Sequence, residues 1–266
     1  FFFVPLRNVG RKMLSGVPSD SFAAEERQAP EPVRQLWLAA KEGDLDRVKL
    51  LHSEGTDVNW PNGDTVPLHV ATGAGHLEVV KFLLQNGAAV EAPVDPWYED
   101  SLDKGFKAMH LAAQNGQTDI MSELLKFGAN PVKPSWWPNM LTPLHVAAAA
   151  GQTDAVKMLL DLKADVNVQS GPGSLEVSAL HIAAASGHLS TVKLLLTAGA
   201  DKALRTEDGK TALELVTEEM NGLGSFNPGN ERGEASNAAQ IRTLLSFSEI
   251  PTSTVYSAEA LPRANL

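Results

Sequence analysis

Residues 142–148 read T-P-L-H-V-A-A, and close variants of this stretch recur along the chain. Copies that begin at Val66, Lys107 and Ser178 read V-P-L-H-V-A, K-A-M-H-L-A and S-A-L-H-I-A. Each copy is followed by a glycine and then by a second apolar run with helical spacing. One such helix pair cannot bury its apolar stripe alone, so neighbouring copies must stack. The sequence therefore predicts an all-α solenoid of stacked antiparallel helix pairs.

The repeated unit resembles the ankyrin repeat, whose T-P-L-H-x-A signature residues 142–148 match in full. Residues 74–84 and 187–201 are similar to the second half of that repeat. The resemblance implies β-hairpin "fingers" that project from the stack between units. It also implies that the repeated histidine hydrogen-bonds backbone between repeats. Four structural histidines occupy this slot: His69, His110, His145 and His181.

Departures from the repeat predict weak points and end caps. Trp37 and Glu214 stand in the histidine slot of two degenerate units, as expected for the ends of a stack. Val66 and Lys107 replace the helix-capping threonine, so we expect weaker helix starts there. Lys163 occupies a slot that is glycine in other copies, where a left-handed conformation costs roughly 1 kcal/mol.

Three segments are expected: a flexible leader at 1–32, about six repeats at 33–247, and a flexible tail at 248–266. The last repeat carries a Gly- and Asn-rich insertion near 220–237, which predicts a loop. We expect a cytoplasmic protein. The leader is basic and has no acidic residue before Asp20, so an organelle transit remnant is the alternative.

Composition argues against several classes of partner and chemistry. The net charge of −10 argues against nucleic acid or an anionic membrane as the main partner. The absence of cysteine excludes disulfides and thiolate chemistry, and no apolar run is long enough to span a bilayer. The sequence contains no H-E-x-x-H, phosphate loop, G-x-G-x-x-G or G-x-S-x-G motif. We therefore predict no catalytic residues, no metal and no cofactor.

Extra length and aromatic residues coincide in the fingers. The spacing from His69 to His110 is 41 residues, against about 33 in the family. Apolar surface in loops is costly to expose, and Trp and Tyr are favoured at binding hot spots. Acidic residues nearby suit a partner with a basic segment. The predicted partner-binding residues are Trp60, Trp97, Tyr98, Glu99, Asp100, Asp103, Trp136, Trp137 and Met140. Phe106 and Glu91 are expected in the same surroundings. The alternative is that the finger aromatics pack on one another.

Two asparagines end their repeats in the context Asp-Val-Asn, with a leucine eight residues earlier. Asn59 and Asn167 thus resemble ankyrin-repeat asparagines that a dioxygenase hydroxylates. The alternative is that each asparagine only serves its turn.

These features together predict a non-catalytic protein–protein interaction module, or scaffold. It would bind a protein or peptide through its concave face and its aromatic fingers. The sequence starts at Phe1 rather than Met. The alternative is therefore an ankyrin-repeat fragment of a larger multidomain protein whose activity lies outside this chain.

Overall fold

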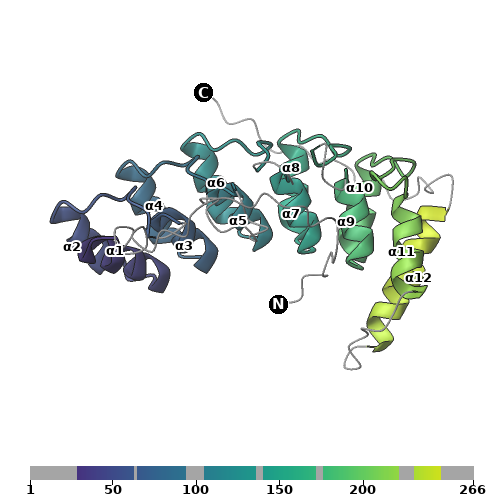
Figure 1. Ribbon diagram of the computed structural model, residues 1–266, viewed down its shortest axis with the longest axis horizontal. Coiled ribbons are helices and arrows are strands. Elements are labelled where there is room, and N and C mark those ends of the chain that lie inside the picture. The colour runs from purple at the N-terminus through teal and green to yellow at the C-terminus, as the bar shows by residue number, and fades with distance from the viewer. Residues whose placement is uncertain are drawn as a thin grey trace, which may run out of the picture.

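The computed structural model describes residues 29–62, 65–93, 105–135, 140–171, 176–221 and 231–246. Twelve α-helices form within these ranges, and they pair into six units that stack in one arched row (Figure 1). Each first helix packs on its own second helix and on the first helices of the adjacent units. The predicted all-α solenoid is confirmed.

The odd-numbered helices line the inner side of the arch, and the even-numbered helices line the outer side (Figure 1). The inner helices are α1 (Glu31–Glu42), α3 (Pro67–Ala74), α5 (Ala108–Gln114), α7 (Pro143–Ala149), α9 (Ala179–Ala185) and α11 (Ala212–Asn221). The outer helices are α2 (Leu45–Ser53), α4 (Leu77–Gln85), α6 (Thr118–Lys126), α8 (Thr153–Asp161), α10 (Leu189–Thr197) and α12 (Glu231–Ser246). Helix α12 begins inside the stretch near 220–237 that was expected to be a loop.

The core is continuous along the row because each unit contributes the same small and large side chains. Inner helices bury an alanine at the contact with their neighbours, which lets them approach closely. These alanines are Ala71, Ala112, Ala147 and Ala183, all fully buried. Outer helices fill the remaining space with leucines, each worth about 1.5–3 kcal/mol of burial. These leucines are Leu83, Leu124, Leu159 and Leu195, also fully buried.

The repeated histidine caps the start of its own helix. In each of four units its Nδ1 accepts the backbone N–H of the residue three positions earlier. The donors are Val66 (3.3 Å), Lys107 (3.2 Å), Thr142 (3.1 Å) and Ser178 (3.2 Å). Val66 and Lys107 therefore keep this bond without a capping hydroxyl, although weaker starts were expected there. The hydroxyls of Thr142 and Ser178 add a second contact to Nδ1.

The same imidazole also ties its unit to the next finger. Because Nδ1 accepts, the proton sits on Nε2, which donates to a carbonyl of the following connection. The acceptors are Ala92 (2.8 Å), Leu141 (3.0 Å), Val168 and Val177 (both 3.1 Å), and Leu204 (3.0 Å). Each histidine thus holds a helix start and a neighbouring connection together.

The two end units each keep one half of this arrangement. Trp37 donates its indole N–H to the Thr65 hydroxyl at 2.9 Å, which preserves the contact to the next finger. Glu214 accepts the Thr211 N–H at 2.7 Å, which preserves the helix cap. Among the described units, the first has a following unit, and Trp37 keeps the bond to it. The last has only a preceding unit, and Glu214 keeps the helix cap.

Further bonds join neighbouring units at the turns of two helix pairs. His76 and His188 donate from Nε2 to the carbonyls of Lys41 (2.9 Å) and Ala149 (3.0 Å) in the preceding unit. Both imidazoles are half-buried. A Cβ on Gly151, which has φ 68°, would lie 2.6 Å from His188 Nδ1. That glycine is required by its conformation and by its neighbour.

The described parts of the fingers contain isolated antiparallel bridges rather than strands. These bridges join Asn62 to Thr65 and Gln169 to Ser178. Among the described residues, each of these two fingers therefore has one bridged pair of residues in place of the expected β-hairpin. None of the helices in the described ranges is long and apolar enough to cross a membrane.

Acid should destabilise the fold through the buried histidines. Burial disfavours imidazolium and lowers the pKa of His69 and His145 to about 4 and that of His110 to about 3. The unfolded chain, with histidine pKa near 6.5, binds protons first, so the free energy of unfolding falls as pH drops from about 6.5 to about 4. Urea unfolding at a series of pH values should show this loss, with a smaller slope in His145→Gln. Equal stability at pH 7 and pH 4.5 would contradict it.

Lys163 adopts the left-handed conformation that the sequence predicts, with φ 67°. Lys163→Gly should therefore raise the free energy of unfolding by about 1 kcal/mol, because glycine carries no Cβ penalty there. The matched control is Gly199→Ala in the same slot, where φ is 91° and no atom lies within 4 Å of the added Cβ. It should lose a similar amount in thermal or urea unfolding. Equal stabilities for wild type and Lys163→Gly would show that the backbone is not strained.

Candidate partner-binding surface

Two of the predicted partner-binding residues, Trp60 and Met140, lie within the described ranges. The other seven fall outside the described residues: Trp97, Tyr98, Glu99, Asp100, Asp103, Trp136 and Trp137. Their part in binding stays a prediction.

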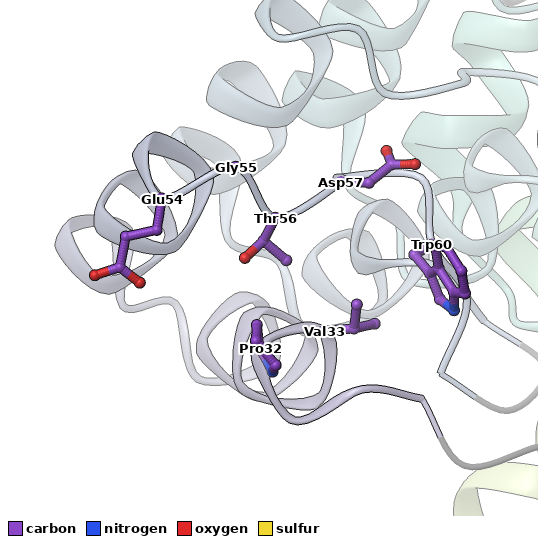
Figure 2. A pocket seen from close by; sticks show the side chains of 7 residues that line it. All are labelled: Pro32, Val33, Glu54, Gly55, Thr56, Asp57 and Trp60. Carbon is purple, nitrogen blue, oxygen red and sulfur yellow. The ribbon is translucent and has the colours of Figure 1, made fainter.

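Trp60 lies in the first finger, and half of its surface (50%) is exposed to solvent. It borders a shallow pocket of about 340 Å³ at the first unit of the stack (Figure 2). The pocket is lined by Pro32, Val33, Glu54, Gly55, Thr56, Asp57 and Trp60. The carboxylates of Glu54 and Asp57 point away from the indole (Figure 2), and Asp57 accepts the Asn59 N–H at 2.8 Å. The pocket therefore presents an aromatic face beside aliphatic side chains.

Met140 and Phe106 pack mainly against other residues of the chain. Met140 has φ 45°, is half-buried, and would collide with a Cβ on Gly171 in the next finger. Phe106 is only 3% exposed and stacks on His110, with ring centroids 5.0 Å apart. Its ring therefore covers the histidine that caps α5 and packs within the chain.

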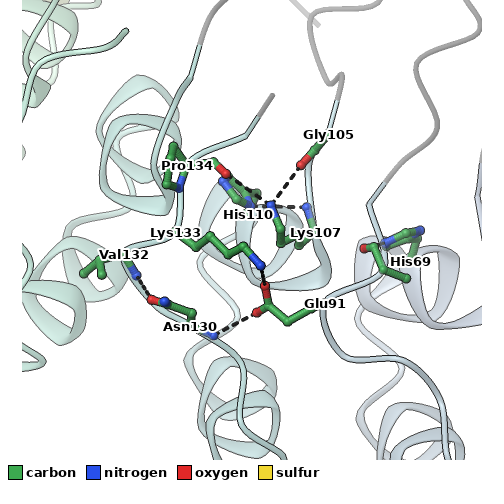
Figure 3. Close-up of polar contacts among 10 residues, drawn as sticks. His69, Glu91, Gly105, Lys107, His110, Asn130, Val132, Lys133 and Pro134 are labelled. Carbon is green, nitrogen blue, oxygen red and sulfur yellow. Dashed lines mark hydrogen bonds and ion pairs between the residues drawn. The ribbon is translucent and has the colours of Figure 1, made fainter. Parts of the chain in front are cut away.

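Glu91 joins two neighbouring fingers and does not stand free on an acidic rim. Its Oε1 accepts the backbone N–H of Asn130 at 2.9 Å, and its Oε2 lies 2.9 Å from Lys133 Nζ (Figure 3). Its side chain is 29% exposed. Both of its carboxylate oxygens therefore have partners within the chain.

Lys107 is buried, which the sequence did not predict. Only 4% of it is exposed, and its ammonium donates to the carbonyls of Pro134 at 3.1 Å and Gly105 at 3.4 Å (Figure 3). Burial lowers the pKa of Lys107, and the nearby Glu91 opposes that shift. The signal in the sequence was a lysine in the slot that is threonine in the signature. Its long side chain reaches the next finger, which a threonine cannot do.

Asn59 and Asn167 each bridge to the following unit. Asn59 donates to the Gly87 carbonyl (2.9 Å) and accepts from the Ala89 N–H (2.7 Å). Asn167 makes the corresponding bonds to Gly199 (3.4 Å) and Asp201 (2.8 Å). The amide groups of both residues are therefore engaged in stacking. Hydroxylation of these asparagines stays a prediction.

The asparagine slot shows why the stack is uneven. Glu91 occupies this slot in the second unit and accepts the N–H of Asn130 in the same way. Val132 occupies it in the third unit, is 42% exposed, and carries no group that can accept a hydrogen bond. The third and fourth units therefore lack the side-chain bridge that Asn59, Glu91 and Asn167 supply at three other junctions.

The described residues contain no group of three or more His, Cys, Asp or Glu side chains placed to hold a metal ion. The four repeated histidines face the backbone of four successive connections, and each ring nitrogen is used in a bond to the chain. Their geometry is that of structural groups.

Comparison with known proteins identifies the family. The model described as "Ankyrin repeats (3 copies)" matches residues 36–135 and 90–170, and the "Ankyrin repeat" model matches residues 176–207. The chain belongs to the ankyrin repeat family. Ankyrin repeats are generally protein–protein interaction modules.

Individual relatives share the repeats over part of their length. The ankyrin repeat and KH domain-containing protein mask-1 of Caenorhabditis elegans is 34% identical over 109 residues, covering 40% of this chain and 4% of that protein. Ankyrin repeat and SOCS box protein 16 of Homo sapiens is 34% identical over 169 residues, covering 60% of this chain and 33% of that protein. The chain spans from 4% to 46% of the length of the first curated relatives it matches.

Among solved structures, this protein is similar to a chain in the complex of the predatory endopeptidase Bd0816 from Bdellovibrio bacteriovorus with the immunity protein Bd3460. The TM-score is 0.61 and the sequence identity is 26%. The match covers 78% of this chain and 97% of that chain. This likeness extends the repeat architecture over most of the described helices.

Val132→Asn should restore the missing bridge between the third and fourth units. An asparagine there can bond the next unit as Asn59 and Asn167 do, which should raise the free energy of unfolding by about 0.5–1.5 kcal/mol. The matched opposite change, Asn167→Val, should lower it by a similar amount. Chemical unfolding of both variants is the measurement. A neutral or destabilising Val132→Asn, with Asn167→Val destabilising, would show that this slot is held differently in the third unit.

Proposed function

We propose that this chain is a non-catalytic module that binds a partner protein or peptide across its inner helices and finger loops. The observation that carries the proposal is Trp60, a tryptophan held half exposed at a shallow pocket of the first unit. A large aromatic side chain exposed at a pocket is typical of a binding hot spot. The family assignment supports the same class of function.

The binding surface includes the concave side of the arch and the fingers that lie along it. The aromatic residues of the fingers supply apolar anchors, and Glu99, Asp100 and Asp103 orient a basic segment of the partner. The net charge of −10 favours such a segment through long-range attraction. The structurally similar chain comes from a complex of an endopeptidase with an immunity protein, which supports a protein as the partner.

A second proposal concerns the context of the chain. Because it spans less than half of the first curated relatives it matches, we also propose that these repeats serve as the recognition part of a longer protein. The recognition surface is the same in both cases.

Site-specific photo-crosslinking tests the binding surface. Benzoylphenylalanine placed at Trp60 or at Ser186, which is exposed at the end of α9, should crosslink a partner protein in lysate of the native cells. The same probe at Lys157, exposed on outer helix α8, is the control and should not. Crosslinks from Lys157 alone, or from none of the three positions, would contradict the proposed binding surface. Mass spectrometry of the crosslinked peptides then identifies the partner segment.

A further inference from the structure

An apolar ladder runs along the inner side of the stack. The residue that follows the histidine slot is a large aliphatic in all six units: Leu38, Val70, Leu111, Val146, Ile182 and Leu215. Leu38 is 38% exposed and Val146 is 4% exposed, while the other four are half-buried. The residues before and after each central ladder position are buried against neighbouring helices. Five of these six side chains are therefore partly accessible on the open side, and Val146 is buried between them.

Uncharged residues, most of them small, complete this open face. Positions three and four residues beyond the ladder lie on the same side of a helix. In the four central units they are Gly73, Ala74, Gln114, Asn115, Ala149, Ala150, Ala185 and Ser186, all exposed or half-buried. Side chains of this size allow another backbone to approach closely. The open face thus combines a row of aliphatic side chains with a row of small ones.

Charge is absent from this face and abundant elsewhere. Helices α3, α5, α7 and α9 contain no Asp, Glu, Lys or Arg, although the chain has a net charge of −10. Each of the outer helices α2, α4, α6, α8 and α10 carries at least one charged residue. If a partner placed a charged side chain against the inner helices, that side chain would lose its water and find no opposite charge. This loss would weaken binding by several kcal/mol. Charge complementarity therefore selects an uncharged, apolar partner face.

The spacing of the ladder restricts the conformation of that partner. Packed helices lie about 8–10 Å apart, so successive ladder residues recur at about that distance. Seven residues of an α-helix rise about 10.5 Å, just above that range, so one heptad per ladder step is the nearest helical register. Same-face residues of a strand recur every 6.6–6.8 Å or so, which does not match. Three residues of polyproline II rise about 9.3 Å and do match.

Hydrogen bonding separates the two conformations that fit. A polyproline II segment leaves its own N–H and C=O groups to be satisfied by water or by the receptor. The open face offers few groups for this, and the amide of Asn115 already donates to the Gly73 carbonyl at 3.1 Å. An α-helix satisfies its own backbone and needs only apolar contact.

We propose that inner helices α3 to α9 bind an amphipathic α-helix of the partner, laid across them, whose uncharged apolar residues recur about every seven positions. This inference rests on the proposed function, because it specifies what the concave surface recognises. The ladder residues contact the apolar stripe of that helix, and the small residues allow its backbone to come close.

Three synthetic peptides of about 28 residues, four heptads long, test the proposal against the full chain by fluorescence polarisation. The first carries Leu and Ala on one helical stripe with Lys and Glu elsewhere. The second has the same composition with the stripe dispersed. The third is proline-rich with Leu at every third position. We expect the first peptide to bind at least tenfold more tightly than either of the others.

Variants of the ladder locate the binding. Leu111→Lys with Ile182→Lys should raise the Kd of the first peptide at least tenfold, and Lys157→Glu on outer helix α8 should leave it unchanged. If circular dichroism shows that the double variant is unfolded, Ala149→Lys, at an exposed position of the open face, takes its place. Equal binding of the first two peptides, tighter binding of the third, or unchanged binding to the folded ladder variants would overturn the proposal. Any of these results together with crosslinks from Trp60 or Ser186 would overturn the helical partner and leave the proposed function standing.

Discussion

The structure depends on one imidazole used twice in each inner unit. Nδ1 accepts the backbone N–H of the residue just before its own helix, and Nε2 donates to the connection that follows the unit. This arrangement requires a neutral ring, which burial enforces by lowering its pKa. Because one side chain fixes both a helix start and the next connection, the position of each unit sets the position of its neighbour. The end units replace the histidine with Trp37 and Glu214, and each keeps only the bond for which it still has a partner.

Other ties between units lie at both edges of the stack, and they differ from one junction to the next. At the finger edge, Asn59, Glu91 and Asn167 bond the following unit, but Val132 cannot. At the opposite edge, His76 and His188 reach back to carbonyls of the preceding unit. The junction between the third and fourth units combines the missing bridge at Val132 with the left-handed Lys163. In a solenoid, stability is close to a sum of such neighbour terms, so this junction is weaker than those bridged by Asn59, Glu91 and Asn167.

The separation of charge explains how the same unit can serve stacking and recognition. Buried alanines and leucines hold the units together, and the charged residues of the central units are concentrated on the outer helices. The inner helices are left with an uncharged open face, beside which Trp60 stands half exposed. A partner can therefore contact this face without competing for the groups that hold the stack.

The sequence by itself determined the repeat, the helix pairs, the histidine slot and the left-handed residue at Lys163, because each depends on positions that recur at a fixed spacing. It also marked the exposed tryptophan in the first finger. Only the tertiary structure decided what the departures do. Glu91 bonds Asn130, 39 residues away, and Lys107 bonds Pro134, 27 residues away, while Phe106 covers His110. A repeat pattern specifies which slot a residue occupies. It does not specify which atom of the next unit lies within reach of a longer or differently charged side chain, because that distance is set by how the units stack.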